Sequence, residues 1–115
     1  MSYRIKQINQ LIQEVLGEIL QKEYQIPLNA LLTILAVETS SDILHSKIIV
    51  SVFPIDAEKE VLKYLEKNIF DIQQFLNKKL VMRPVPKIRF EIDRTEFEAE
   101  KIEKLLEEIK ETNDK

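Results

Sequence analysis

The sequence contains no cysteine and a single glycine, and each shortage excludes familiar kinds of site. Without cysteine there is no disulfide, no thiolate zinc site and no thiol nucleophile. With Gly17 as the only glycine, the chain cannot form a P-loop, a dinucleotide-binding fingerprint or the GxxG clamp of many RNA-binding domains. A cysteine-free chain suits a reducing compartment, and we expect a cytoplasmic protein.

Residues that could carry catalysis are equally scarce. The only histidine, His45, lies between two β-prone segments, where a structural role is the usual one. The glutamates near the C-terminus alternate with lysines around one predicted helix, which is typical of a solvated face and not of a metal site. No nucleophile, acid–base pair or ligand set can be assembled. We therefore expect no enzyme, metal, cofactor or small-molecule substrate.

Long apolar runs are also missing. The first twenty residues are interrupted by charged and amide side chains, among them Arg4, Lys6 and Asn9, so they predict neither a secretory signal nor a membrane span. A length of 115 residues with 44% hydrophobic composition fits one modest core. We expect a single domain over residues 1–110, followed by a short disordered acidic tail at 111–115.

Hydrophobic periodicity predicts an α+β domain with the element order α-β-β-α-β-α. Asp56 is expected to cap the second helix, and Thr95 with Glu98 forms a capping box at the start of the last one. The stripe of that last helix consists of Phe97, Ile102, Leu105, Leu106 and Ile109. The expected helices cover 2–24, 57–79 and the stretch from 95 to about 110, and the expected strands cover 32–39, 46–53 and 87–93.

Two strands, a crossover helix and a third strand predict a small three-stranded mixed sheet with its helices packed on one face. The third strand alternates apolar residues with Lys87, Arg89 and Glu91, so the other face should be open and polar. Gly17 lies inside the first helix, where glycine costs about 1 kcal/mol relative to alanine. Close packing of another backbone against Gly17 is the expected reason.

The charge distribution identifies one candidate binding surface. The net charge of −3 argues against a nucleic-acid partner at first. However, residues 1–90 carry twelve Lys or Arg against ten Asp or Glu, and the acidity belongs to residues 91–115, with five against ten. The run 78–90 has five basic residues and no acidic one. On charge alone it fits an RNA-binding surface or, more commonly, a solvated basic patch on a protein-binding module; Lys78 and Lys79 would also suit a helix C-terminus.

Three segments resemble the ribosome-binding factor A family, and the resemblance extends over residues 4–109. The first is the helix RIKQINQLIQEVLGEIL at 4–20. The second is VETSSDILHSKIIVSVF at 37–53, with Val37, Glu38, Ser40, Asp42, Ser46 and Ser51 in register. The third and most specific is LVMRPVPKIRFEID at 80–93, where Lys87 replaces an acidic residue of the family.

The resemblance implies a type II KH-like fold with the order α-β-β-α-(α)-β-α. It implies a monomeric, non-catalytic assembly factor that binds the free small (30S) ribosomal subunit and 16S rRNA near its 5′ end, and that aids late maturation and rRNA processing. The alternative from a different class is a protein-interaction or dimerisation module, which would use the acidic C-terminal helix or open-face residues such as Ile49 and Phe53.

One departure from the family concerns the kink between its two central helices. The family has alanine, any residue and glycine there, and this chain has Asn68, Ile69 and Phe70. Gln73 likewise stands where many relatives have arginine. Phe70 cannot replace glycine in a tight approach to phosphate. We therefore assign RNA binding to basic residues elsewhere, namely Arg4, Lys6, Lys78, Lys79, Arg83, Lys87 and Arg89.

Overall fold

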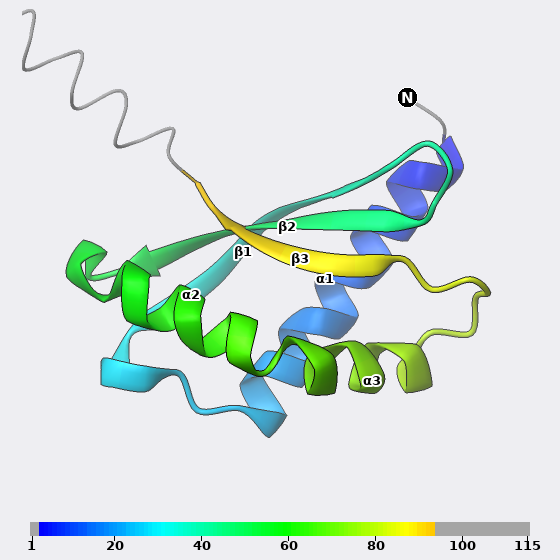
Figure 1. The fold of residues 1–115 in the computed structure, drawn as a ribbon. Coiled ribbons are helices and arrows are strands. Elements are labelled where there is room, and N and C mark those ends of the chain that lie inside the picture. Colours follow the sequence, from blue (N-terminus) through cyan, green and yellow to red (C-terminus); the bar gives the residue numbers. More distant parts are fainter. Residues whose placement is uncertain (1–2, 94–115) are drawn as a thin grey trace, which may run out of the picture.

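The computed structural model describes residues 3–93, which form a three-stranded sheet with three long helices (Figure 1). The predicted last helix and the tail at 111–115 lie outside the described residues. The elements are α1 (Tyr3–Glu23), the 3₁₀ turn η1 (Pro27–Asn29), β1 (Leu31–Thr39), β2 (His45–Phe53), the 3₁₀ turn η2 (Ile55–Ala57), α2 (Glu58–Lys67), α3 (Ile69–Lys79) and β3 (Lys87–Ile92).

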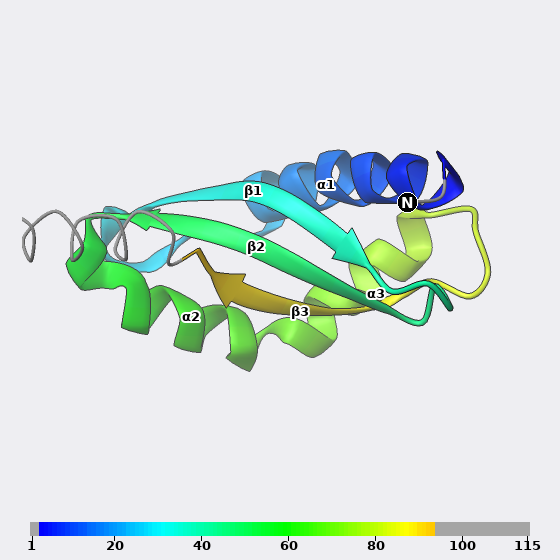
Figure 2. The ribbon, with the colours of Figure 1, turned by 90° about the horizontal axis from the view of Figure 1, so that it is seen from above.

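The sheet has the strand order β1-β2-β3, with β1 and β2 antiparallel and β2 and β3 parallel. Figures 1 and 2 show that the helices lie on one face of this sheet and leave the other face open. A parallel pair needs a long crossover, and α2 with α3 supplies it. The predicted α+β class and mixed sheet are confirmed, and within residues 3–93 the helices pack on one face as predicted.

The core lies between the helices and the covered face of the sheet. Alternate residues of β2 and β3 point into it, whereas Lys87, Arg89 and Glu91 are exposed, as the alternation predicts. The apolar faces of the helices supply the other half of the core, and side chains such as Ile12, Leu16 and Leu65 are fully buried. No buried side-chain nitrogen or oxygen among the described residues lacks a hydrogen-bond partner.

Three local expectations differ from the structure. The helix expected over 57–79 is two helices that meet at Asn68. Asp56 does not cap α2, because the chain after Pro54 first forms a 3₁₀ turn in which the Ala57 N–H donates to the Pro54 carbonyl at 3.0 Å. A Cβ added at Gly17 would meet nothing within 4 Å, so close backbone packing does not explain this glycine.

The β1–β2 turn is held by side chains that the resemblance placed in register. The Asp42 carboxylate accepts from the Ser40 hydroxyl and from the Leu44 N–H at 3.1 Å. The hydrogen bond from Ser40, followed by the one from Leu44, lowers the pKa of Asp42. The Thr39 hydroxyl donates to Asn9 Oδ1 at 2.6 Å, which ties the turn to α1. The turn is thus fixed beside the start of the first helix.

Candidate nucleic-acid interface

Figures 1 and 2 both place four segments at one end of the molecule: the start of α1, the β1–β2 turn, the end of α3, and the loop between α3 and β3. We call this the basic end, because it carries the cations selected from the sequence. All of them are exposed: Arg4, Lys6, Lys78, Lys79, Arg83, Lys87 and Arg89. The fold therefore brings together cations from two separate parts of the chain, residues 4–6 and 78–89.

Most of these cations have no acidic partner among the residues that the structure describes. Within residues 3–93, no Asp or Glu carboxylate forms an ion pair with Lys78, Lys79, Arg83 or Lys87. Arg83 Nη1 donates to the carbonyls of Leu80 at 3.3 Å and Met82 at 2.7 Å, which orients the side chain and leaves further guanidinium donors unused. These side chains can contact phosphates without first breaking a salt bridge.

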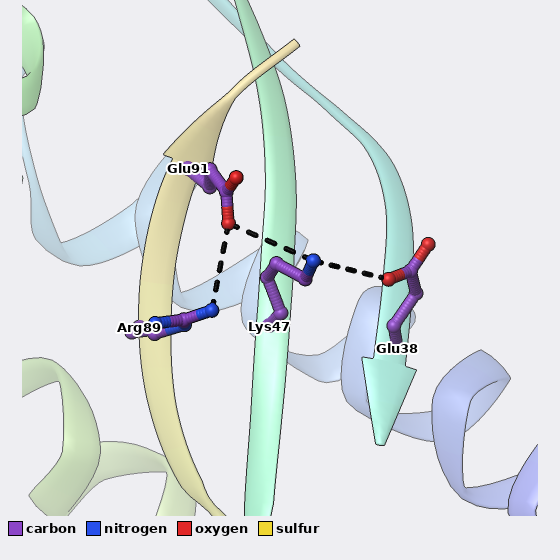
Figure 3. A network of polar contacts seen from close by, with 4 residues as sticks. All are labelled: Glu38, Lys47, Arg89 and Glu91. Carbon is purple, nitrogen blue, oxygen red and sulfur yellow. Dashed lines mark ion pairs between the residues drawn. The ribbon is translucent and has the colours of Figure 1, made fainter. Parts of the chain in front are cut away.

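Arg89 is the exception, since it belongs to an ion-pair network on the open face of the sheet (Figure 3). The Glu91 carboxylate forms ion pairs with Lys47 at 3.8 Å and with Arg89 at 3.7 Å, and Lys47 also pairs with Glu38 at 3.5 Å. Lys47 and Arg89 lie opposite each other on β2 and β3. The Glu91 carboxylate therefore bridges two positive charges that would otherwise repel each other. The four charges sum to zero, and Arg89 contributes less positive potential than its neighbours.

Gln73 positions the start of β3, a role that the sequence did not indicate. Its Nε2 donates to the Pro86 carbonyl at 3.1 Å, and its Oε1 accepts from the Ile88 N–H at 2.9 Å. One carboxamide therefore clamps the backbone on both sides of Lys87 and joins α3 to β3. An arginine has no acceptor for the Ile88 N–H, so glutamine is suited to this contact.

An open hollow of about 520 Å³ lies where β3 begins. Lys87, Arg89 and Lys47 line it together with the His45 ring and the hydroxyl-bearing residues Thr39, Ser40 and Ser46; Glu38 is its one acidic residue. Amines and hydroxyls are the groups that proteins use to contact phosphate and sugar. Lys87 therefore lies on a concave part of the surface, next to the exposed cations of the α3–β3 loop.

The helix break at Asn68 does not depend on glycine. Asn68 has φ −99° and ψ 6°, which is outside the left-handed region, and its Nδ2 donates to the Tyr64 carbonyl at 2.8 Å. The Tyr24 ring contacts Tyr64 on α2 and Phe75 on α3 edge-to-face, with centroids 6.4 Å and 6.1 Å apart. Burial, and then Asp71, raise the pKa of Tyr24. The contacts of this partly exposed ring with both helices therefore support the junction.

The kink residues do not join the basic end, because the eleven residues of α3 separate them, or about 16 Å of helix. Ile69 is half-buried against the core and Phe70 is 71% exposed. Glu66, Lys67 and Asp71 flank the break in the sequence and sum to one negative charge, so the break offers no excess of cations to phosphate. The geometry thus separates the kink from the exposed cations.

Phe70 occupies the family's glycine position, yet it lies in α3 and does not have a positive φ. Replacing Phe70 with glycine should therefore lower the free energy of unfolding, by up to about 1 kcal/mol relative to Phe70→Ala, since glycine only adds backbone entropy to the unfolded chain. Urea denaturation of the two variants measures this difference. A glycine variant more stable than the alanine variant would show that the position needs glycine after all.

In the part of the chain from 3 to 93, no helix is long and apolar enough to cross a bilayer. The same residues contain no group of three or more His, Cys, Asp or Glu arranged to hold a metal ion.

Comparison with known proteins gives one consistent family. The sequence profile described as Ribosome-binding factor A matches residues 4–106. Ribosome-binding factor A of Chlorobium phaeobacteroides is 32% identical over 113 residues, covering 96% of this chain and 97% of that protein. The Bdellovibrio bacteriovorus protein of the same name is 31% identical over 107 residues, covering 92% and 80%.

Solved structures agree in fold. The crystal structure of ribosome-binding factor A from Thermus thermophilus has a TM-score of 0.65 at 22% identity, over 76% of this chain and 93% of that one. A homology model of the Thermus thermophilus protein, fitted into the cryo-EM map of its complex with 30S, has a TM-score of 0.63 at 26% identity, over 75% of this chain and 91% of that one. The KH-like arrangement implied by the resemblance is therefore confirmed, and this chain belongs to the ribosome-binding factor A family.

Proposed function

We propose that this protein is a non-catalytic assembly factor that binds the free small ribosomal subunit through the basic end. Its target is 16S rRNA near the 5′ end, and it aids late maturation and rRNA processing. Two findings support the proposal: membership of a family named for ribosome binding, and a Thermus relative fitted into a 30S complex. The observation that carries it is the set of exposed cations at one end of the fold, of which Lys78, Lys79, Arg83 and Lys87 have no acidic partner within residues 3–93.

The chemistry of the basic end fits a folded RNA surface. Lys78, Lys79 and Lys87 supply point charges for phosphate oxygens, and Arg83 adds a planar guanidinium that can hold a phosphate with two hydrogen bonds. These contacts follow the RNA backbone and not the base edges, so shape and charge guide docking. The Gln73 clamp keeps Lys87 at a fixed distance from the end of α3.

The experiment for the cellular role compares cells with and without the protein. Loss of the protein should leave free small subunits that carry 16S rRNA with an unprocessed 5′ end, which primer extension detects. Reintroduced wild-type protein should restore the mature end. Normal 5′ ends and normal subunit profiles in the depleted cells would rule out a role in rRNA maturation.

Affinity for small subunits should fall steeply with salt. If Lys78, Lys79, Arg83 and Lys87 each neutralise one phosphate, log K plotted against log salt should have a slope of roughly −3, from about −0.7 per contact with single-stranded nucleic acid. Fluorescence anisotropy of labelled protein with purified subunits, measured over a salt series, gives the slope. A slope near zero would contradict binding through phosphates.

A further inference from the structure

The open face of the sheet has two chemically distinct halves. One half carries the ion-pair network of Glu38, Lys47, Arg89 and Glu91 (Figure 3). The other half, which we call the neutral half, contains no charged side chain. It is formed by three opposed pairs of β1 and β2 residues, Leu31 with Phe53, Thr33 with Ser51, and Ala36 with Ile49.

The neutral half leaves large apolar side chains uncovered. Leu31 is 65% exposed and Phe53 is 72% exposed, and they lie directly opposite each other across β1 and β2. Ile49 lies four residues from Phe53 on β2, beyond the Thr33–Ser51 pair, and is half-buried. Antiparallel sheets that face water on one side normally place polar residues there. Two large apolar side chains exposed directly opposite each other indicate that another segment packs on them.

The end of β3 places the following segment beside this surface. β3 ends at Ile92, opposite Val50, and the Asp93 N–H donates to the Val50 carbonyl at 2.8 Å. β2 continues for three more residues, to Phe53, without β3 alongside. The 22 residues from 94 to 115 therefore begin at the edge of the neutral half.

The sequence of that segment is amphipathic. Its apolar stripe, Phe97, Ile102, Leu105, Leu106 and Ile109, is flanked by glutamates and lysines. A helix over 95–109 would be about 22 Å long, whereas three strands span only about 10 Å across the sheet. The segment is long enough to cross the face, and it can leave its acidic side chains in water.

We propose that residues 95–109 fold back as a helix across the neutral half of the open face and cover Leu31, Ile49 and Phe53. A groove of about 550 Å³ along α2 is the competing position, and Ile55, Leu62 and Ile92 line its apolar part. That groove also carries Asp56, Glu58 and Glu66 against two lysines. Its excess of negative charge disfavours an acidic helix. The neutral half carries no charged side chain of its own, and the acid that borders it, Glu91 opposite Ile49, is paired with Lys47 and Arg89.

The absence of cysteine makes a sharp test possible on the full chain. Lys104 lies off the apolar stripe, so Lys104→Cys can take a paramagnetic label without removing a stripe residue. In spectra of ¹⁵N-labelled protein, the amide signals of Leu31, Ile49 and Phe53 should lose most of their intensity, whereas those of Lys59 and Lys63 on the α2 groove should keep it. The opposite pattern, or no loss at either surface, would overturn the proposal.

A second sample separates folding back from pairing with another copy. Spin-labelled protein at natural isotope abundance is mixed with ¹⁵N protein that lacks the spin label, and the signals of the neutral half should be unaffected. Loss of signal in this mixed sample would mean that a second chain covers the face, which also contradicts the proposal. Neither sample contains ribosomes, so the outcome is independent of the proposed function.

A matched pair of variants checks that the apolar contact holds the segment. Phe53→Asp in the labelled chain should restore the lost signals of Leu31 and Ile49, because it places a charge under an acidic helix. Val81→Asp is the control, since Val81 is 98% exposed in the α3–β3 loop. It should leave the signal loss unchanged. Equal behaviour of the two variants would contradict docking on Phe53.

Discussion

The triple substitution of Lys78, Lys79 and Arg83 by glutamate should reduce affinity for free small subunits on the order of 10²- to 10³-fold. A hydrogen bond to a charged group contributes about 1.5 kcal/mol or more, and each tenfold change in affinity corresponds to about 1.4 kcal/mol. The reversed charges also repel phosphates. Fluorescence anisotropy with purified subunits, at one fixed salt concentration, measures the loss.

The control changes the same number of charges on another surface. Lys59, Lys63 and Lys67 are exposed on α2, away from the basic end, and their replacement by glutamate gives the same net charge. This variant should keep affinity within a few-fold of wild type, apart from a general weakening by its negative charge. If both triple variants lose affinity equally, net charge and not the basic end governs binding. Thermal melting of each variant verifies that it is folded.

The second large effect is expected at Gln73. Gln73→Ala removes the acceptor of the Ile88 N–H and the donor to the Pro86 carbonyl, and Ile88 is only 2% exposed. An unsatisfied buried backbone group costs about 1–3 kcal/mol, so the melting temperature should fall by roughly 10 °C. Differential scanning calorimetry measures the shift, and amide exchange at Ile88 should accelerate.

The neighbouring Gln74 provides the matched control, because it is exposed on the other side of the same turn of α3. Gln74→Ala should change the melting temperature by only a degree or two. A third variant, Gln73→Arg, retains donors but has no acceptor, so it should be destabilised as well. A Gln73→Arg variant as stable as wild type would show that the Ile88 N–H does not need this partner.

The sequence predicted the elements because local patterns determine them. The alternation around Ile88 and Phe90 and the stripe of α1 each require only one segment at a time. The order of strands followed because two β-prone runs, a crossover and a third strand have few compact arrangements. The break at Asn68 was not located from periodicity, since the apolar stripe runs without interruption from Leu65 through Ile69 to Ile72.

The site was only partly predictable, because its neighbours are distant in the sequence. The exposed cations were found from the absence of acids between residues 78 and 90. The alternation of β3 predicts that Arg89 and Glu91 share a face, but it does not show that they form an ion pair. The contacts of Lys47 with Glu91 and Glu38 depend on the register between strands, which the sequence does not reveal. The Gln73 clamp joins residues that are 13 and 15 positions apart, and one glutamine gives no sequence signal of such a contact.

The proposed role of the basic end is to attach this protein to free small subunits. The most direct measurement is a sucrose-gradient profile of tagged wild-type protein from its own cells, run beside the Lys78, Lys79 and Arg83 to glutamate variant. Wild-type protein should migrate with free small subunits and be absent from translating ribosomes, and the variant should remain at the top of the gradient. A variant that still migrates with free small subunits would contradict the account.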